Sequence, residues 1–165
     1  MTFPVPSPAF SPVSNAGASE SAAILDFWFA GGIRLGWPSQ DTNAIWFGAG
    51  AALDADIKAR FGKQVLRAVA GGLTHWETDA TRRLALIILL DQFTRNVFRG
   101  DQRAFDGDTR ARQLALRTLA LDEDQSLPRV GRVFVCMPLM RAEDLALQEE
   151  CVARFSRLVA GAPRR

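Results

Sequence analysis

The sequence predicts an all-α protein of stacked antiparallel helical hairpins, and three observations support this prediction. Leu53, Ile57, Phe61, Val65 and Val69 recur at every fourth position, which is the spacing of one face of a helix. No Asn-Gly or similar turn separates alternating apolar runs, so the sequence offers no signal of a β-hairpin. The links between the amphipathic segments are short, and short links favour antiparallel neighbours.

The first 18 residues are expected to be a disordered tail, because they combine four prolines with Ser, Ala and Gly and carry no charged side chain. The folded part is expected to be a single domain over residues 19–161. Its first helix runs through residues 24–29, with Ser19 or Ser21 as the predicted N-cap. Five aromatic residues in and after this helix are expected in the core. They are Phe27, Trp28, Phe29, Trp46 and Phe47.

Two longer helices form the middle of the expected fold. One runs from about residue 51 to residue 70 and ends at a pair of glycines. The other has Thr78 as its predicted N-cap and Asp79 in its first turn, where a carboxylate suits the helix dipole, and it ends near Phe98. Residues 84–90 are all apolar, which predicts that this central helix is enclosed by protein on every side.

The remaining chain is expected to contain two further helices and one ambiguous segment. A helix is predicted at about residues 103–120, with Phe105 on its buried side. Residues 132–137 fit either a short helix or a strand, because they are apolar and partly β-branched. Pro138 suits the first turn of a last helix. The predicted buried stripe of that last helix is Leu145, Val152, Phe155 and Val159.

Composition argues against several classes of function. The 20 basic residues alternate with 18 acidic ones and form no cationic cluster, so nucleic-acid binding is not expected. The longest apolar run has seven residues, whereas crossing a bilayer takes about 20, so no membrane span is expected. Cys136 and Cys151 have apolar neighbours and are predicted to pack as core side chains in a reducing compartment, the cytoplasm. With one histidine, His75, and no Cys-x-x-Cys pair, neither a metal nor a cofactor is expected.

The strongest functional signal directly follows the apolar run. Asp91, Gln92, Arg95, Asn96 and Arg99 lie within nine residues. Asp91 and Arg95 are four apart and are predicted to form an ion pair on one helical face. Arg95 and Arg99, also one turn apart, repel each other unless an anion lies between them. That anion is either a carboxylate of the protein or a carboxylate or phosphate of a ligand.

Two acidic residues elsewhere are candidate members of the same site. Asp106 is one of the carboxylates that could join the arginines, although it also suits the start of the following helix. Glu143 stands at the start of the last helix, where it either complements the helix dipole or reaches back to Arg95 or Arg99.

Three functional interpretations therefore stay open. The first is a binding or scaffold module in which Arg95 and Arg99 grip the anionic group of a peptide or small ligand while Asp91 and Asn96 orient them. The second is a hydrolase-type enzyme acting on a small anionic substrate, with Asp91 or Glu143 as general base and Arg95 as charge stabiliser. The third is a buried polar network that joins helices and binds no ligand.

Several segments resemble a bacterial family known as domain of unknown function 924. They are ILDFWF at 24–29, RF at 60–61, LALIILLDQFTRNVFRG at 84–100, AFDGD at 104–108 and RVFVCMPLMRAEDLALQE at 132–149. The resemblance implies an all-helical fold similar to tetratricopeptide-repeat proteins. It implies no established reaction.

The chain departs from the family pattern in three places. Thr94 stands where the family usually has Pro, and Arg141-Ala142 stands where it usually has His-Ser before the glutamate. The family also usually continues into a second motif, Phe-Pro-His-Arg-Asn, which this sequence lacks. The resemblance therefore implies a missing C-terminal segment, which would leave an apolar flank open for oligomerisation or make the chain a truncated, non-functional member.

Overall fold

The computed structural model describes residues 16–38, 41–48 and 50–161, and every regular element in these ranges is helical. This confirms the predicted all-α class. The longer helices are α1 (Ala16–Phe29), α4 (Ala51–Val69), α5 (Ala80–Ile88), α7 (Asp108–Ala120), α8 (Arg129–Met140) and α9 (Leu145–Ala160). The short ones are α2 (Gly32–Leu35), α3 (Asn43–Trp46) and α6 (Thr94–Val97). Single turns connect them: η1 (Thr74–Thr78), η2 (Leu89–Phe93), η3 (Gln102–Phe105) and η4 (Glu123–Ser126).

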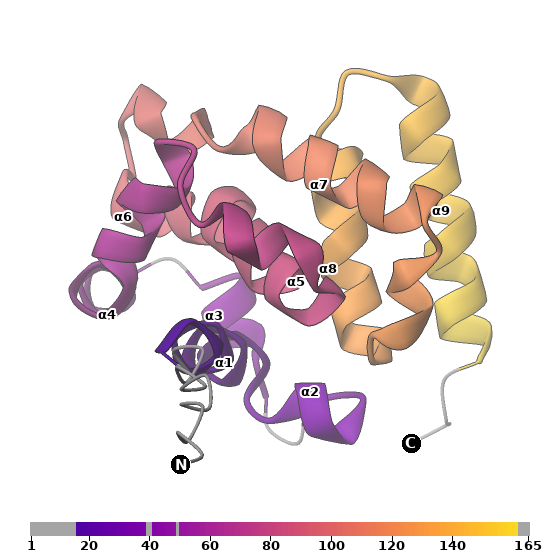
Figure 1. The fold of residues 1–165 in the computed structure, drawn as a ribbon, viewed down its shortest axis with the longest axis horizontal. Coiled ribbons are helices and arrows are strands. Elements are labelled where there is room, and N and C mark those ends of the chain that lie inside the picture. Colours follow the sequence, from indigo (N-terminus) through magenta and orange to yellow (C-terminus); the bar gives the residue numbers. More distant parts are fainter. Residues whose placement is uncertain (1–15, 39–40, 49, 162–165) are drawn as a thin grey trace, which may run out of the picture.

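Helix α5 lies at the centre of the fold and contacts α1, α7 and α8 (Figure 1). Every residue from 84 to 90 is buried, as the apolar run predicts. The chain then passes without a break through η2 into α6, and α4 packs against both of these elements. On the other side, α8 packs between α5 and α9, so that the C-terminal half forms stacked hairpins.

Helix beginnings differ from the prediction at three points. Because α1 begins at Ala16, neither Ser19 nor Ser21 caps it, and residues 1–15 of the predicted tail lie outside the described ranges. Thr78 ends the turn η1, and it is Asp79 that caps α5 by accepting the N–H of Arg82 at 2.9 Å.

Pro138 does not start the last helix. Residues 132–137 are helical and belong to α8, and Pro138 lies in the last turn of that helix. Proline has no N–H to donate to the carbonyl four residues back, so α8 lacks one backbone hydrogen bond just before it ends. The N-cap of α9 is Asp144, whose Oδ1 accepts the N–H of Leu147 at 3.2 Å.

The predicted core is correct in the middle of the chain and wrong at its margins. Ile57, Phe61 and Val65 of α4 are buried, and Trp28 and Phe29 of α1 are as well. Two aromatic residues predicted to be buried are exposed instead: Phe47 follows the short helix α3 and is 76% exposed, and Phe105 belongs to the turn η3, ahead of α7, and is 62% exposed.

The predicted stripe of α9 is mostly exposed. Leu145, Val152 and Val159 are 70%, 53% and 74% exposed, and α9 contacts α8 instead through Cys151 and the partly buried Phe155. Self-association of the chain through this region stays a prediction. Among the described helices, none is both long enough and apolar enough to cross a bilayer.

Candidate functional site

The central polar group follows a change in helical winding. In the turn η2 the backbone widens to a π-helix, and the N–H of Thr94 bonds to the carbonyl of Leu89, five residues back. Side chains four apart across such a turn no longer lie above one another as they do in an α-helix. The predicted Asp91–Arg95 ion pair is therefore wrong, and the two side chains bind different partners.

Asp91 is 1% exposed, and two neighbours hold its carboxylate. Gln92 Nε2 donates to Oδ2 at 2.6 Å, and Arg141 Nη1 donates to Oδ1 at 3.2 Å and to the Asp91 carbonyl at 3.0 Å. Burial raises the pKa of Asp91, because an enclosed carboxylate loses hydration, while the Arg141 charge acts in the opposite direction. Asp91 thus fixes one edge of the Arg141 guanidinium, and Gln92 holds Asp91.

Arg95 is bound to the beginning of α7. Its guanidinium donates to both carboxylate oxygens of Asp108, at 2.5 and 3.0 Å, and to the carbonyl of Ala104 at 3.0 Å. The ring of Phe105 lies 5.1 Å from the guanidinium carbon. This arrangement ties η3 and α7 to the central helix and leaves Arg95 committed to protein acceptors.

Asn96 and Arg99 bind a third carboxylate, Asp54 of α4. Asn96 Nδ2 donates to Oδ1 at 2.9 Å, and Arg99 donates through Nε to Oδ2 at 2.5 Å and through Nη2 to Oδ1 at 2.9 Å. The hydrogen bonds from Arg99 lower the pKa of Asp54. Arg95 and Arg99 therefore share no anion. The two remaining candidates, Asp106 and Glu143, are exposed and form no ion pair with either arginine.

A hollow of about 490 Å³ lies beside this network, between α7 and the beginning of α9. It is lined by Arg112, Arg141, Ala142, Glu143, Asp144 and Leu147. We call it the Arg112–Arg141 hollow. Glu143 is the one predicted site residue in its wall. Asp91 and Gln92 reach it only through Arg141.

Arg112 is the unusual residue of this hollow. It is half-buried, no hydrogen bond or ion pair joins it to any described residue, and its Nε is enclosed without a partner. The Nε and Nη2 groups of Arg141 also lack partners within the described ranges, since only Nη1 contacts Asp91. Sequence reasoning missed both arginines. Arg141 had a signal, since it replaces the histidine usual in the resembling family, whereas nothing in the pattern of α7 singles out Arg112.

Within the described residues, no group of three or more His, Cys, Asp or Glu side chains is placed to hold a metal ion. The charged side chains of the Arg112–Arg141 hollow are two arginines and two acids, Glu143 and Asp144, and the guanidinium groups are the donors that could bind an anion.

Comparison with known proteins places the chain among proteins without an assigned activity. A family model described as a bacterial protein of unknown function, DUF924, matches residues 24–165. The solved structure of a protein of unknown function, ATU0120 from Agrobacterium tumefaciens, is 33% identical and superimposes with a TM-score of 0.71. The match covers 86% of this chain and 74% of that one. A search of curated proteins finds no match.

Proposed function

The chain belongs to the bacterial family of unknown function DUF924, and on that premise we propose that it is a binding module for an anionic group. The group, a carboxylate or phosphate of a peptide or small molecule, would occupy the Arg112–Arg141 hollow. The observation that carries this proposal is the unpartnered guanidinium of Arg112 in the wall of that hollow.

An enclosed N–H donor without an acceptor is costly, since it has lost water and gained nothing in exchange. The terminal amino groups of Arg112 also have no partner among the described residues, and a carboxylate or phosphate in the hollow can accept two parallel N–H bonds from them. Arg141 adds a second set of unused donors to the same wall. Asp91 is a positioning residue in this scheme, because it holds Arg141 without lining the hollow, and Gln92 acts through Asp91.

The same geometry favours binding over hydrolysis. Asp91 is too enclosed to take a proton from a substrate in the hollow, and Arg95 is committed to Asp108 and lies outside its wall. Glu143 and Asp144 remain as rim carboxylates, and they would repel a second negative charge on the ligand. We therefore expect a preference for singly charged groups.

The test is calorimetric titration of the purified chain with inorganic phosphate, with acetate, and with a short peptide ending in a free carboxylate or in an amide. We expect the probes that carry an anionic group to bind. The amide-ended peptide should bind at least about tenfold more weakly than the peptide with a free carboxylate. Comparing the affinity for phosphate and acetate with the affinity for the peptide shows whether the ligand is a small molecule or a peptide.

Arg112→Gln should weaken binding by about tenfold or more, which corresponds to the loss of one charged hydrogen-bonding group. Arg103→Gln is the matched control, because it removes the same charge from an exposed residue whose ion pair is with its neighbour Asp101 and whose guanidinium also lies over the Phe98 ring, away from the hollow. Equal binding by wild type and Arg112→Gln would contradict the proposal. An equal loss in both variants would also do so, since it would indicate general charge attraction.

We also propose that the chain works in the cytoplasm. What supports this is that Cys136 and Cys151 are buried and free although they lie side by side, with the Cys151 thiol 3.5 Å from the Cys136 carbonyl. An oxidising compartment would favour a disulfide between such neighbours.

A further inference from the structure

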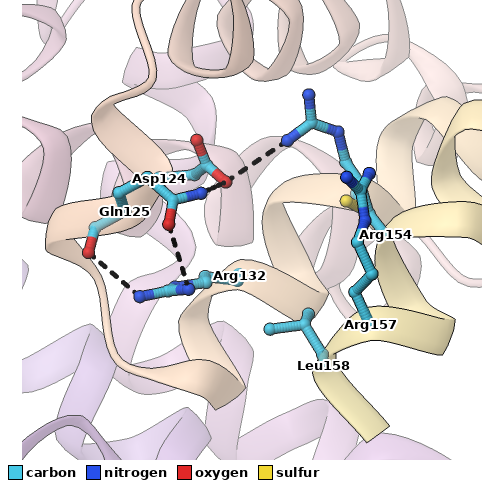
Figure 2. Close-up of a pocket in the computed structure, with 7 residues that line it drawn as sticks. Asp124, Gln125, Arg132, Arg154, Arg157 and Leu158 are labelled. Carbon is cyan, nitrogen blue, oxygen red and sulfur yellow. Dashed lines mark hydrogen bonds and ion pairs between the residues drawn. The ribbon is translucent and has the colours of Figure 1, made fainter. Parts of the chain in front are cut away.

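A second hollow, of about 300 Å³, lies between η4, α8 and α9, and it shares no lining residue with the hollow described above. Its wall contains Asp124 and Gln125 of η4, Arg132 and Cys136 of α8, and Arg154 and Arg157 of α9. Figure 2 shows Asp124 and Gln125 on one side of this hollow and Arg154 and Arg157 on the opposite side. The wall therefore presents an acid and an amide across from two guanidinium groups.

Asp124 is a buried carboxylate with too few donors. It is 4% exposed, and its Oδ1 is enclosed and has no hydrogen-bond partner. Its Oδ2 receives two long contacts, from Gln125 Nε2 at 3.3 Å and from Arg154 Nη1 at 3.5 Å. Buried carboxylates in folded proteins usually have close donors, because losing hydration is costly for a charged group. Oδ2 lies on the side that faces Arg154 (Figure 2), so a further donor can reach it from the hollow.

The arginines of α9 have donors left over. Arg157 Nε contacts the Ala153 carbonyl at 3.3 Å, and no described residue accepts from its two terminal amino groups. Arg154 donates through Nε to Glu150 at 2.7 Å and through Nη1 to Asp124, which leaves its Nη2 without a partner. Arg132 differs, because it is bound to the carbonyls of Leu127 and Gln125 and serves as part of the wall.

We propose that this hollow binds a small zwitterion, such as a free α-amino acid. The carboxylate of the ligand lies against the terminal amino groups of Arg157 and Arg154, and its ammonium group donates to Oδ2 of Asp124. Leu158 supplies an apolar contact for the rest of the molecule. A purely anionic ligand would place its charge near the buried Asp124, and a purely cationic one would face three arginines. Only a ligand with both charges satisfies both sides.

The first experiment compares probes that differ in one charge. L-Leucine is titrated into the purified chain and followed by calorimetry, beside 4-methylpentanoate, which lacks the ammonium group, and 3-methylbutylamine, which lacks the carboxylate. Glycine, L-glutamate and L-lysine extend the series to other side chains. We expect at least one amino acid to bind, and the two single-charge analogues of leucine to bind at least about tenfold more weakly than leucine.

Three variants locate the binding. Arg157→Gln, an exposed change, should weaken amino-acid binding by about tenfold, whereas Arg112→Gln should leave it unchanged. Asp124→Asn should remove the preference for leucine over 4-methylpentanoate, and circular dichroism checks that this variant folds. If Asp124→Asn does not fold, the probe series and Arg157→Gln still test the proposal.

The proposal is overturned if no amino acid in the series binds, if 4-methylpentanoate binds as tightly as leucine, or if Arg157→Gln binds like wild type. Because Arg112→Gln acts on the other hollow, its effect on phosphate and acetate tests the proposed function separately.

Discussion

Replacing Arg95 with alanine tests whether the residue joins helices or binds a ligand. The change removes the bidentate ion pair with Asp108 and the hydrogen bond to the Ala104 carbonyl. The side chains of the pair are 22% and 28% exposed. Exposed pairs contribute about 0–1 kcal/mol, and breaking a fully buried pair costs about 3–5 kcal/mol. For this half-buried pair we expect Arg95→Ala to lower the free energy of unfolding by about 2 kcal/mol.

The assay is urea and thermal unfolding of wild type, Arg95→Ala, Asp108→Ala and the double variant. For a chain of this size, 2 kcal/mol lowers Tm by about 4–8 °C. The cycle should give a coupling energy of at least about 1 kcal/mol between the two residues. Arg103→Ala is the control and should cost less than about 1 kcal/mol, because its pair with Asp101 is 61% and 43% exposed. If Arg95→Ala costs no more than this control, Arg95 does not join helices in the way we describe.

Four further predictions concern two acids, one glycine and one thiol. The pKa of Asp91 is raised in the folded state, so the wild type gains stability as pH falls toward 3.8, the ordinary pKa of an aspartate. Asp91→Asn lacks this gain and should therefore lose stability relative to the wild type on acidification, as urea titrations would measure. Asp54, whose pKa is lowered, should behave in the opposite way, and the deficit of Asp54→Asn should shrink as pH falls. Gly107→Ala should cost about 1–3 kcal/mol in the same assay, because a Cβ there would lie 2.4 Å from the Leu90 carbonyl oxygen. Burial raises the pKa of Cys136 to about 12, so its thiol should resist alkylation by iodoacetamide until the chain unfolds, as mass spectrometry would detect.

Helical spacing alone was enough to predict much of the fold. The stripe on α4 and the burial of the run at 84–90 follow directly from residue type and position, and the structure confirms both. The exposed side of α9 shows the limit of this reasoning. A periodic apolar stripe predicts that a helix has an apolar face, but it does not say that another element covers that face.

The candidate site was less predictable, because its contacts join distant parts of the chain. Arg99 binds a carboxylate 45 residues away, and Arg141 binds Asp91 across 50 residues. A single sequence with no aligned relatives carries no signal for such pairs. The i,i+4 rule also assumed regular α-helical winding, and the π turn η2 invalidates it at Asp91. Arg112 was not predicted for a different reason. Its distinguishing property is the absence of a hydrogen-bond partner, which only the folded structure reveals.

The π turn at Leu89–Phe93 also fixes the direction in which the following side chains point. Rewinding the same residues as an ordinary α-helix would rotate everything that follows about the axis, because a π turn contains about one residue more than an α turn. Arg95 would swing away from Asp108 in the same motion that carried Arg99 away from Asp54. Loss of the π turn at unchanged length would thus disconnect two helices at once, whereas exchanging either arginine disconnects only one.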